Sequence, residues 1–275
     1  MKTIKRVLPV AMAGAALALA TSAQVAMAAP PEPFKQTNIH FETNSSGCDM
    51  GIQMSFDTDG ITEGSVEDPN EQDVFSIGAV EGMEETQDLT ESFHERVEPP
   101  IIELENALGC EPSSNAISLA DLFDAWPAGT YEFEGLSGGV EFEGVAKLTH
   151  RVPAGPEITA PSDGAIVAHD AALLIRWLKV TTPILPSLGP IEIVGYHVVV
   201  VDITAPVLAP GKTKTALDAD LSKNETTFHV PKQYLEPNRI YEFEVLATEK
   251  GGNQTITEGG VFCTSPILPA NCEGP

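Results

Sequence analysis

The stretch "LEPNRIYEFEVLATEKGGNQT", residues 235–255, decides the fold of the second half of this chain. In its middle Tyr241, Phe243 and Val245 recur at every second position. Successive side chains of a strand point to opposite faces, so this alternation predicts a strand with one apolar face. The residues Gly-Gly-Asn at 251–253 then predict a turn that leads into another strand.

The segments around this stretch predict more strands of the same kind. They read "PEITAPSDGAIV", "ALLIRWLKV", "IEIVGYHVVVVDI", "TTFHVP" and "TITEGGVFC". Six or seven short strands with turns between them and no long helix predict an antiparallel β-sandwich. Trp177 ends one of these strands, and so large an aromatic side chain needs a core between two sheets to bury it.

Residues 158–266 resemble a fibronectin type III domain. In that family a tryptophan lies on the second strand and a tyrosine on the third, as Trp177 and Tyr196 do here. In the same family the pattern Leu-x-Pro-x-x-x-Tyr marks the start of the sixth strand, and Leu235, Pro237 and Tyr241 match it. The resemblance implies an immunoglobulin-like sandwich with a tyrosine corner, in which the Tyr241 hydroxyl bonds back to the backbone just upstream. It also implies that Leu235 packs below this corner and that Pro237 fixes the turn.

One departure from the family pattern is the segment "KVTTPILPSLGPIEI", residues 179–193. It makes the loop between the second and third strands longer and richer in proline than is usual. A loop at the end of a sandwich either carries a contact surface or is mere padding, and both interpretations remain open.

The first half, residues 37–150, predicts a smaller β-rich domain with short helices. Strands are expected at 37–43, 50–57 and 74–80, and a hairpin of two strands turns at "LSGG". "DGITEGSVEDPNEQD" is expected to be an acidic loop rich in turns. "PPIIELENAL" and "SLADLFDAW" predict short helices, the second with Ser118 as its N-cap. This half resembles uncharacterised secreted bacterial proteins that end in one type III domain, a likeness that implies no activity.

The remaining segments predict the domain boundaries. Residues 29–36 read as an extended leader and residues 267–275 as a tail. Three prolines and a glycine in "RVPAGPEITAP" predict a stiff linker at 151–157 between the two domains.

Residues 1–28 have the pattern of a secretory signal peptide. A basic start precedes a short apolar run, and "AMA" at residues 26–28 is a small-x-small cleavage site. We therefore expect a secreted or periplasmic protein after cleavage near Ala28. The alternative is an uncleaved anchor helix, but the apolar run is short of the roughly 20 residues that a membrane span needs. No later segment is apolar and long enough to span a membrane.

The charge balance restricts the partners. The chain of 275 residues holds 40 acidic and 15 basic residues, for a net charge of −25. Such a surface repels nucleic acid and anionic lipid, so neither is expected as a partner. The acidic residues form either a solvated coat or a surface that binds cations.

The four cysteines predict two disulfides, because an even number in an exported chain favours pairing. Three pairings are possible, and pairing within each half is the simplest: Cys48 with Cys110 and Cys263 with Cys272. Four free thiols are the alternative. No Cys-x-x-Cys motif is present, so neither a zinc nor a redox site is expected.

No motif for catalysis or for a cofactor stands out. "GLSGG" around Ser137 resembles a nucleophile elbow, but strands are predicted on both sides of it instead of a strand and a helix. "HERVE" at His94 lacks the second histidine of a zinc helix. The one calcium candidate is "DTDGITE", in which Asp57, Asp59 and Glu63 offer hard oxygen ligands. It lacks the glycine and the glutamate of a complete EF-hand loop, which favours an ordinary acidic turn.

Two classes of function follow. The first is a non-enzymatic exported protein that binds, adheres or acts as a spacer at the cell envelope or outside the cell, with a protein or glycan as partner. The alternative is an accessory module of an extracellular hydrolytic system, with an active site in the first domain. Asn44, Asn224 and Asn253 each begin an N-x-Ser/Thr sequon, and their glycosylation depends on the host.

Overall fold

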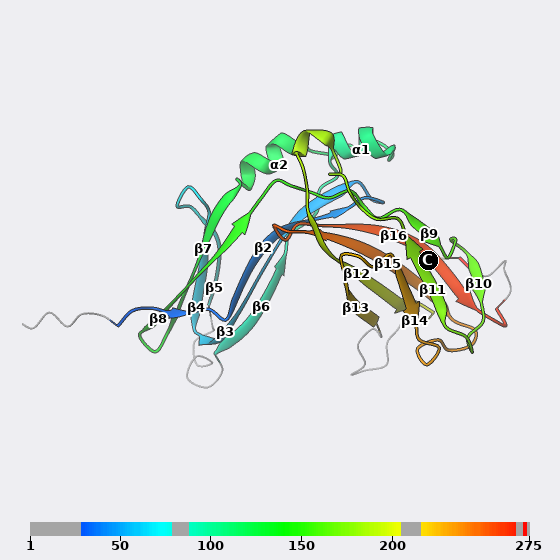
Figure 1. Ribbon diagram of the computed structural model, residues 1–275. Helices are drawn as coiled ribbons and strands as arrows, with labels where there is room; N and C mark the ends of the chain where they lie inside the picture. The colour runs from blue at the N-terminus through cyan, green and yellow to red at the C-terminus, as the bar shows by residue number, and fades with distance from the viewer. Residues whose placement is uncertain (1–28, 79–87, 205–215, 268–271, 274–275) are drawn as a thin grey trace, which may run out of the picture. The chain divides into compact units, whose positions relative to one another are not determined.

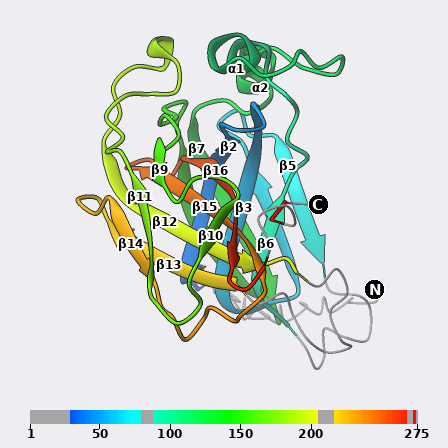
Figure 2. The ribbon, with the colours of Figure 1, turned by 90° about the vertical axis from the view of Figure 1, so that its right-hand side faces the viewer.

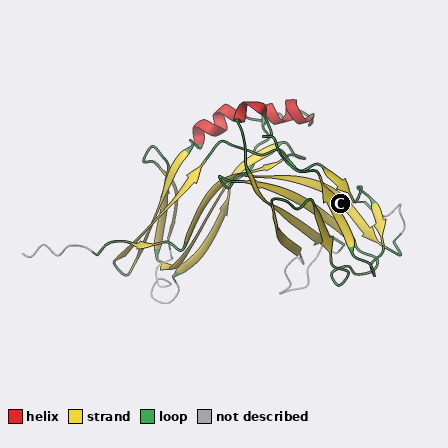
Figure 3. Ribbon diagram, viewed as in Figure 1, coloured by secondary structure: helices red, strands yellow, loops and turns green. Residues whose placement is uncertain are grey.

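The computed structural model describes residues 29–78, 88–204, 216–267 and 272–273 (Figure 1). The predicted signal peptide, residues 1–28, lies outside the described residues. In the described part of the chain, strands dominate and two short α-helices accompany them (Figure 3), which confirms the mostly β fold class. No helix in these ranges is both long and apolar enough to cross a membrane.

The C-terminal half is a sandwich of two sheets (Figure 2). One sheet has the order β14–β11–β9, and the other contains β13–β12–β15–β16, with β10 paired to β16. The bounds are β9 Ile158–Ala160, β10 Ala165–Val167, β11 Leu173–Trp177, β12 Ile193–Asp202, β13 Ala216–Ser222, β14 Thr227–Val230, β15 Ile240–Glu249 and β16 Gln254–Thr264. Side chains from both sheets form one core, so the predicted immunoglobulin-like sandwich is confirmed.

The residues of the type III pattern meet in this core. If β9 and β10 together count as the first strand, Trp177 ends the second strand, Tyr196 lies on the third and Tyr241 on the sixth. All three are at most 2% exposed. The Tyr241 hydroxyl donates to the Tyr234 carbonyl at 3.3 Å and accepts from the Glu236 N–H at 2.8 Å. This is the geometry of a tyrosine corner.

The N-terminal half is a second sandwich with its own core. A sheet of order β1–β8–β7–β4–β5 packs against β2, β3 and β6. The bounds are β1 Glu32–Pro33, β2 Gln36–Asn44, β3 Asp49–Ile61, β4 Glu63–Glu67, β5 Asp73–Gly78, β6 Leu89–Glu95, β7 Gly129–Ser137 and β8 Val140–Leu148. Phe41, Met50, Tyr131 and Phe133 are the large side chains at its centre, each at most 1% exposed.

One segment of this half differs from the prediction. Within the expected acidic loop, residues Glu63–Glu67 form β4, so the loop assignment was wrong there. Of the β4 side chains, Val66 is the one that is buried, and the other four residues are poor strand formers. The strand forms because β5 and β7 supply backbone partners on both of its sides. The hairpin β7–β8 is confirmed.

Both predicted helices are confirmed. Helix α1 spans Ile102–Leu108 and ends at Gly109, whose φ of 84° is in the left-handed region that glycine favours. Helix α2 spans Leu119–Ala125, and the Ser118 hydroxyl accepts from the Asp121 N–H at its start. Leu104 and Leu122 anchor the two helices on the N-terminal core.

The two sandwiches share one sheet. Strand β16 of the C-terminal half pairs in parallel with β2 of the N-terminal half, so that a sheet of eight strands runs in the order β13–β12–β15–β16–β2–β3–β6 with β10 beside β16. We call the β2–β16 contact the seam. The predicted linker 151–157 packs along it: Val152 is fully buried in the N-terminal core, and the Pro153 carbonyl accepts from Thr255 at 2.7 Å. The division into two domains stays a prediction.

The long proline-rich loop connects the halves a second time. Its residue Ile184 is 8% exposed and belongs to the N-terminal core, although it follows β11 of the C-terminal half. The Ile184 N–H donates to Val152 at 3.0 Å, and the Ala154 N–H donates to Thr182 at 2.9 Å. The loop also contains a single 3-10 turn, η1 Pro186–Leu188. Neither of the two open interpretations anticipated that this loop would complete the core of the other sandwich.

Candidate functional site

Asn253 holds the seam together. Its side chain is fully buried between the two halves. Its Oδ1 accepts from the Phe41 N–H at 2.8 Å, and its Nδ2 donates to the Thr149 and Arg151 carbonyls, both at 2.8 Å. One amide therefore satisfies three backbone groups on two other segments, β2 and residues 149–151, which a buried interface requires. A glycan on Asn253 is incompatible with these bonds, whereas Asn224 is exposed in the β13–β14 turn.

A group of carboxylates lies on the other face of the shared sheet, away from the N-terminal core. Glu42 on β2, Glu95 on β6 and Glu98 just beyond β6 each offer an oxygen, and these oxygens lie within 4.8 Å of one another. We call these three residues the carboxylate cluster. Gln53 pairs with Glu95 in the sheet register and donates to Glu42 at 2.8 Å, and Gln254 of β16 donates to the other Glu42 oxygen. The cluster thus reaches the seam.

Glu98 is the most perturbed member of the cluster. Burial raises its pKa to about 7, and the charges of Glu42, Asp49 and Glu95 add to the rise. Its Oε1 is buried without a hydrogen-bond partner. Gly51 makes this position possible, because a Cβ there would lie 2.5 Å from Glu98 Cγ. The pKa of Asp49 is also raised, by burial and then by Glu258.

No lysine or arginine among the described residues forms an ion pair with the cluster. For Glu42, burial is the largest cause of a raised pKa, and the amides of Gln254 and Gln53 together with the charge of His197 oppose the rise. Gathered carboxylates of this kind favour a bound proton or a hard cation. Sequence reasoning missed the cluster, because Glu42 lies about 50 residues before Glu95 and Glu98, and no motif links the two segments.

We expect Glu98→Gln to stabilise the protein at pH 8. A carboxylate whose pKa is higher in the folded than in the unfolded state contributes stability below its ordinary value of 4.5 and loses it as the pH rises toward about 7. The full shift corresponds to about 3 kcal/mol. Because Glu98 is partly exposed, we discount this to a gain of about 1–2 kcal/mol. Chemical denaturation at pH 8 and at pH 4.5 measures it, with no gain expected at pH 4.5.

Glu157→Gln is the matched control for this experiment, because it removes one charge from an exposed position just before β9. It should change stability little, and equally at both pH values. A Glu98→Gln effect that is the same at pH 4.5 and pH 8 would contradict the assigned titration.

The calcium candidates have other partners. Lys35 Nζ lies 2.7 Å from Asp59 and 3.6 Å from Asp57, so a lysine occupies the space between these two carboxylates. Glu63 lies on β4, in register with Leu136 of β7. Asp57 and Asp59 lie on β3 and Glu63 on β4, so the ordinary acidic turn that the sequence favoured is not formed. Calcium binding stays the untested alternative.

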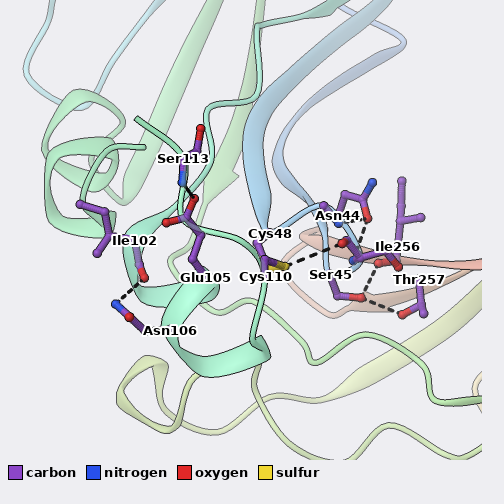
Figure 4. Close-up of a disulfide and its surroundings, with 12 residues drawn as sticks. Asn44, Ser45, Cys48, Ile102, Glu105, Asn106, Cys110, Ser113, Ile256 and Thr257 are labelled. Carbon is purple, nitrogen blue, oxygen red and sulfur yellow. Dashed lines mark hydrogen bonds between the residues drawn. A yellow bond between two sulfur atoms is a disulfide. The ribbon is translucent and has the colours of Figure 1, made fainter. Parts of the chain in front are cut away.

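Both disulfides pair within a half, as the sequence favours. Cys48 in the β2–β3 turn bonds Cys110 just beyond α1, and Cys263 on β16 bonds Cys272. Figure 4 shows the first disulfide beside Ser45, whose hydroxyl donates to the Ile256 carbonyl at 2.8 Å. The Cys48–Cys110 disulfide therefore holds the end of α1 close to the seam.

Ser137 and His94, the two residues whose motifs resemble catalytic or zinc sites, both lie on strands. Ser137 ends β7 and donates to Asp88 at 3.1 Å, a hairpin position without the strand–turn–helix context of a nucleophile elbow. His94 on β6 contacts the ring of Phe75 with centroids 4.0 Å apart.

No protein-family profile matches this chain, and no curated protein matches it. Among solved structures, the chicken CNTN1 FN1–FN3 domains are similar over 85% of this chain, at 12% identity and a TM-score of 0.30. The titin domains A168–A170 are similar over 82%, at 14% identity and a TM-score of 0.26. The chain spans 64% of the length of each. The fold assignment rests on this chain's own strand order and core.

Proposed function

We propose that this protein is a non-enzymatic, exported module that binds a partner at the cell envelope or outside the cell and holds it at a fixed distance. The observation that carries the proposal is the seam. Ordinary tandem domains meet in small polar contacts and move relative to one another. Here a continuous hydrogen-bonded sheet and the buried Asn253 join the two sandwiches. Such a joint suits a stiff spacer.

The disulfides support export, because such bonds form and persist in oxidising compartments. The negative charge of the surface disfavours an anionic polymer as the partner. On the outer face of the five-stranded sheet, Glu63, Glu134, Glu141 and Glu143 surround a hollow of about 680 Å³. This face repels nucleic acid and favours a neutral glycan or a protein with a basic surface.

The two tryptophans make the stiffness of the joint testable. Trp126 packs against the N-terminal core and Trp177 lies in the C-terminal core. In the variants Trp177→Phe and Trp126→Phe, fluorescence therefore reports on one half at a time. We expect each fluorescence transition in urea to coincide with the transition in far-UV circular dichroism, because the two halves unfold as one unit. Separate midpoints in either variant would contradict a single stiff module.

We expect Asn253→Ala to lower the free energy of unfolding by about 2–3 kcal/mol, because it leaves the buried Phe41 N–H and the carbonyls of Thr149 and Arg151 without their partner. In the single-tryptophan backgrounds it should also separate the two transitions. The control is Asn224→Ala in the exposed β13–β14 turn, which should do neither. An Asn253→Ala protein as stable as the control would show that the seam does not couple the halves.

The alternative, an accessory module of a hydrolytic system, has one observation in its favour. Glu98 has a pKa near 7 beside Glu42 in the N-terminal half, and such a pair suits general acid–base chemistry. Hydrolysis of an extracellular polysaccharide or peptide that Glu98→Gln abolishes would establish this alternative over the spacer.

A further inference from the structure

A second hollow has the opposite electrostatic character from the rest of the molecule. Its volume is about 750 Å³, and it lies between α2, the end of β8 and the turn η1 of the long loop. Lys147, His150 and Arg151 line it, and none of its lining residues is acidic. The chain has 40 acidic and 15 basic residues, so a hollow lined by three basic side chains and no carboxylate differs from the average composition of the chain.

The two cations of this hollow are available to a ligand. Neither Lys147 nor Arg151 forms an ion pair within the described residues, whereas Lys35, Arg239 and Lys250 all do. Both side chains lie at exposed positions at or just beyond the end of β8. Both line the same hollow, and a lysine and an arginine that face one site can each donate charge-assisted hydrogen bonds to a carboxylate or phosphate group.

The walls of the hollow suit a ring. The His150 ring stacks on Phe123 with centroids 3.8 Å apart and planes within 9°. The Trp126 carbonyl lies 2.9 Å from His150 Nε2 and can only accept, so that nitrogen carries a proton and donates to it. This bond fixes the orientation of the imidazole. Leu188 of η1 adds apolar surface, and Ser187 adds a hydroxyl.

We propose that this hollow binds a small organic anion, a ring that bears a carboxylate or phosphate group. The anionic group lies between Lys147 and Arg151, and the ring lies against the aromatic pair and Leu188. The volume falls in the range of small-molecule sites. The proposal does not depend on the spacer role, because it concerns a different surface from the acidic face.

Isothermal titration calorimetry of the full chain tests the proposal with three probes: benzoate, phenyl phosphate and glucuronate. The first two distinguish carboxylate from phosphate, and the third distinguishes a sugar ring from an aromatic one. We expect saturable binding of at least one probe, weakened by added salt because the contact is ionic. Benzylamine carries the opposite charge and should not bind at this site. The absence of saturable binding for all three anions would overturn the proposal.

The variant Lys147→Gln/Arg151→Gln should weaken binding of that probe by about tenfold or more, since it removes two charge-assisted hydrogen bonds. The matched control is Arg176→Gln/Lys179→Gln, which removes the same two charges from exposed positions outside the hollow. Affinity that falls equally in both variants, or in neither, would overturn the assignment. If the double variant does not fold, the single variants Lys147→Gln and Arg151→Gln make the same comparison.

Discussion

Replacement of Trp177 by alanine is expected to lower the free energy of unfolding by about 3–5 kcal/mol, the usual loss for a buried large aromatic side chain. Trp177 is 2% exposed and lies in the C-terminal core, where its ring contacts Tyr196 with centroids 5.5 Å apart. Alanine leaves a cavity between the two sheets, and the rigid strands on either side cannot collapse to fill it. Urea denaturation followed by far-UV circular dichroism measures the loss.

Trp177→Phe separates the loss of the ring from the loss of the indole N–H. The Trp177 Nε1 is buried without a hydrogen-bond partner. Phenylalanine keeps most of the apolar volume and removes this unsatisfied donor, which partly offsets the smaller ring. We therefore expect a much smaller loss than for alanine. A loss below about 1 kcal/mol for Trp177→Ala would be too small for a core residue and would contradict its burial.

Removal of the Cys48–Cys110 disulfide by a double alanine substitution should destabilise the protein by about 4 kcal/mol in the chain-entropy model. The two cysteines are 62 residues apart, so their bond restricts the unfolded chain strongly. Cys48 is also fully buried, and its carbonyl accepts from the Ile101 N–H at 2.9 Å next to the start of α1. Loss of the disulfide should loosen α1 before it affects the C-terminal sandwich. Hydrogen exchange should therefore show faster exchange of the amides of α1 than of those of the C-terminal sandwich.

The other disulfide is the matched comparison. Cys263 and Cys272 are nine residues apart in sequence, and their loss should cost about 2.5 kcal/mol in the same model. The expected order is therefore a larger loss for the Cys48/Cys110 pair than for the Cys263/Cys272 pair. A reversed order would show that local packing, and not the length of the closed loop, governs the contribution of these bonds.

The sequence determined those features that depend on neighbours along the chain. The alternation around Tyr241 predicted β15, because a strand repeats every two residues whatever surrounds it. Ser118 predicted the start of α2 through a bond to a residue three positions away. Where local propensity and partners disagreed, as in β4, the prediction was wrong, because two neighbouring strands outweighed the residues' own preference.

Only the tertiary structure decided how the halves meet and where the candidate sites lie. From the sequence, Asn253 is predicted to lie in a turn and begins a sequon. In the fold its side chain is hydrogen-bonded to the backbone of both Phe41 and Arg151. Ile184 reads as part of a loop and lies in the other sandwich's core. Glu42 and Glu98 come from segments far apart in the chain, and the sheet brings their carboxylates together. Contacts between distant segments depend on the packing of whole sheets, and no local pattern of residues encodes them.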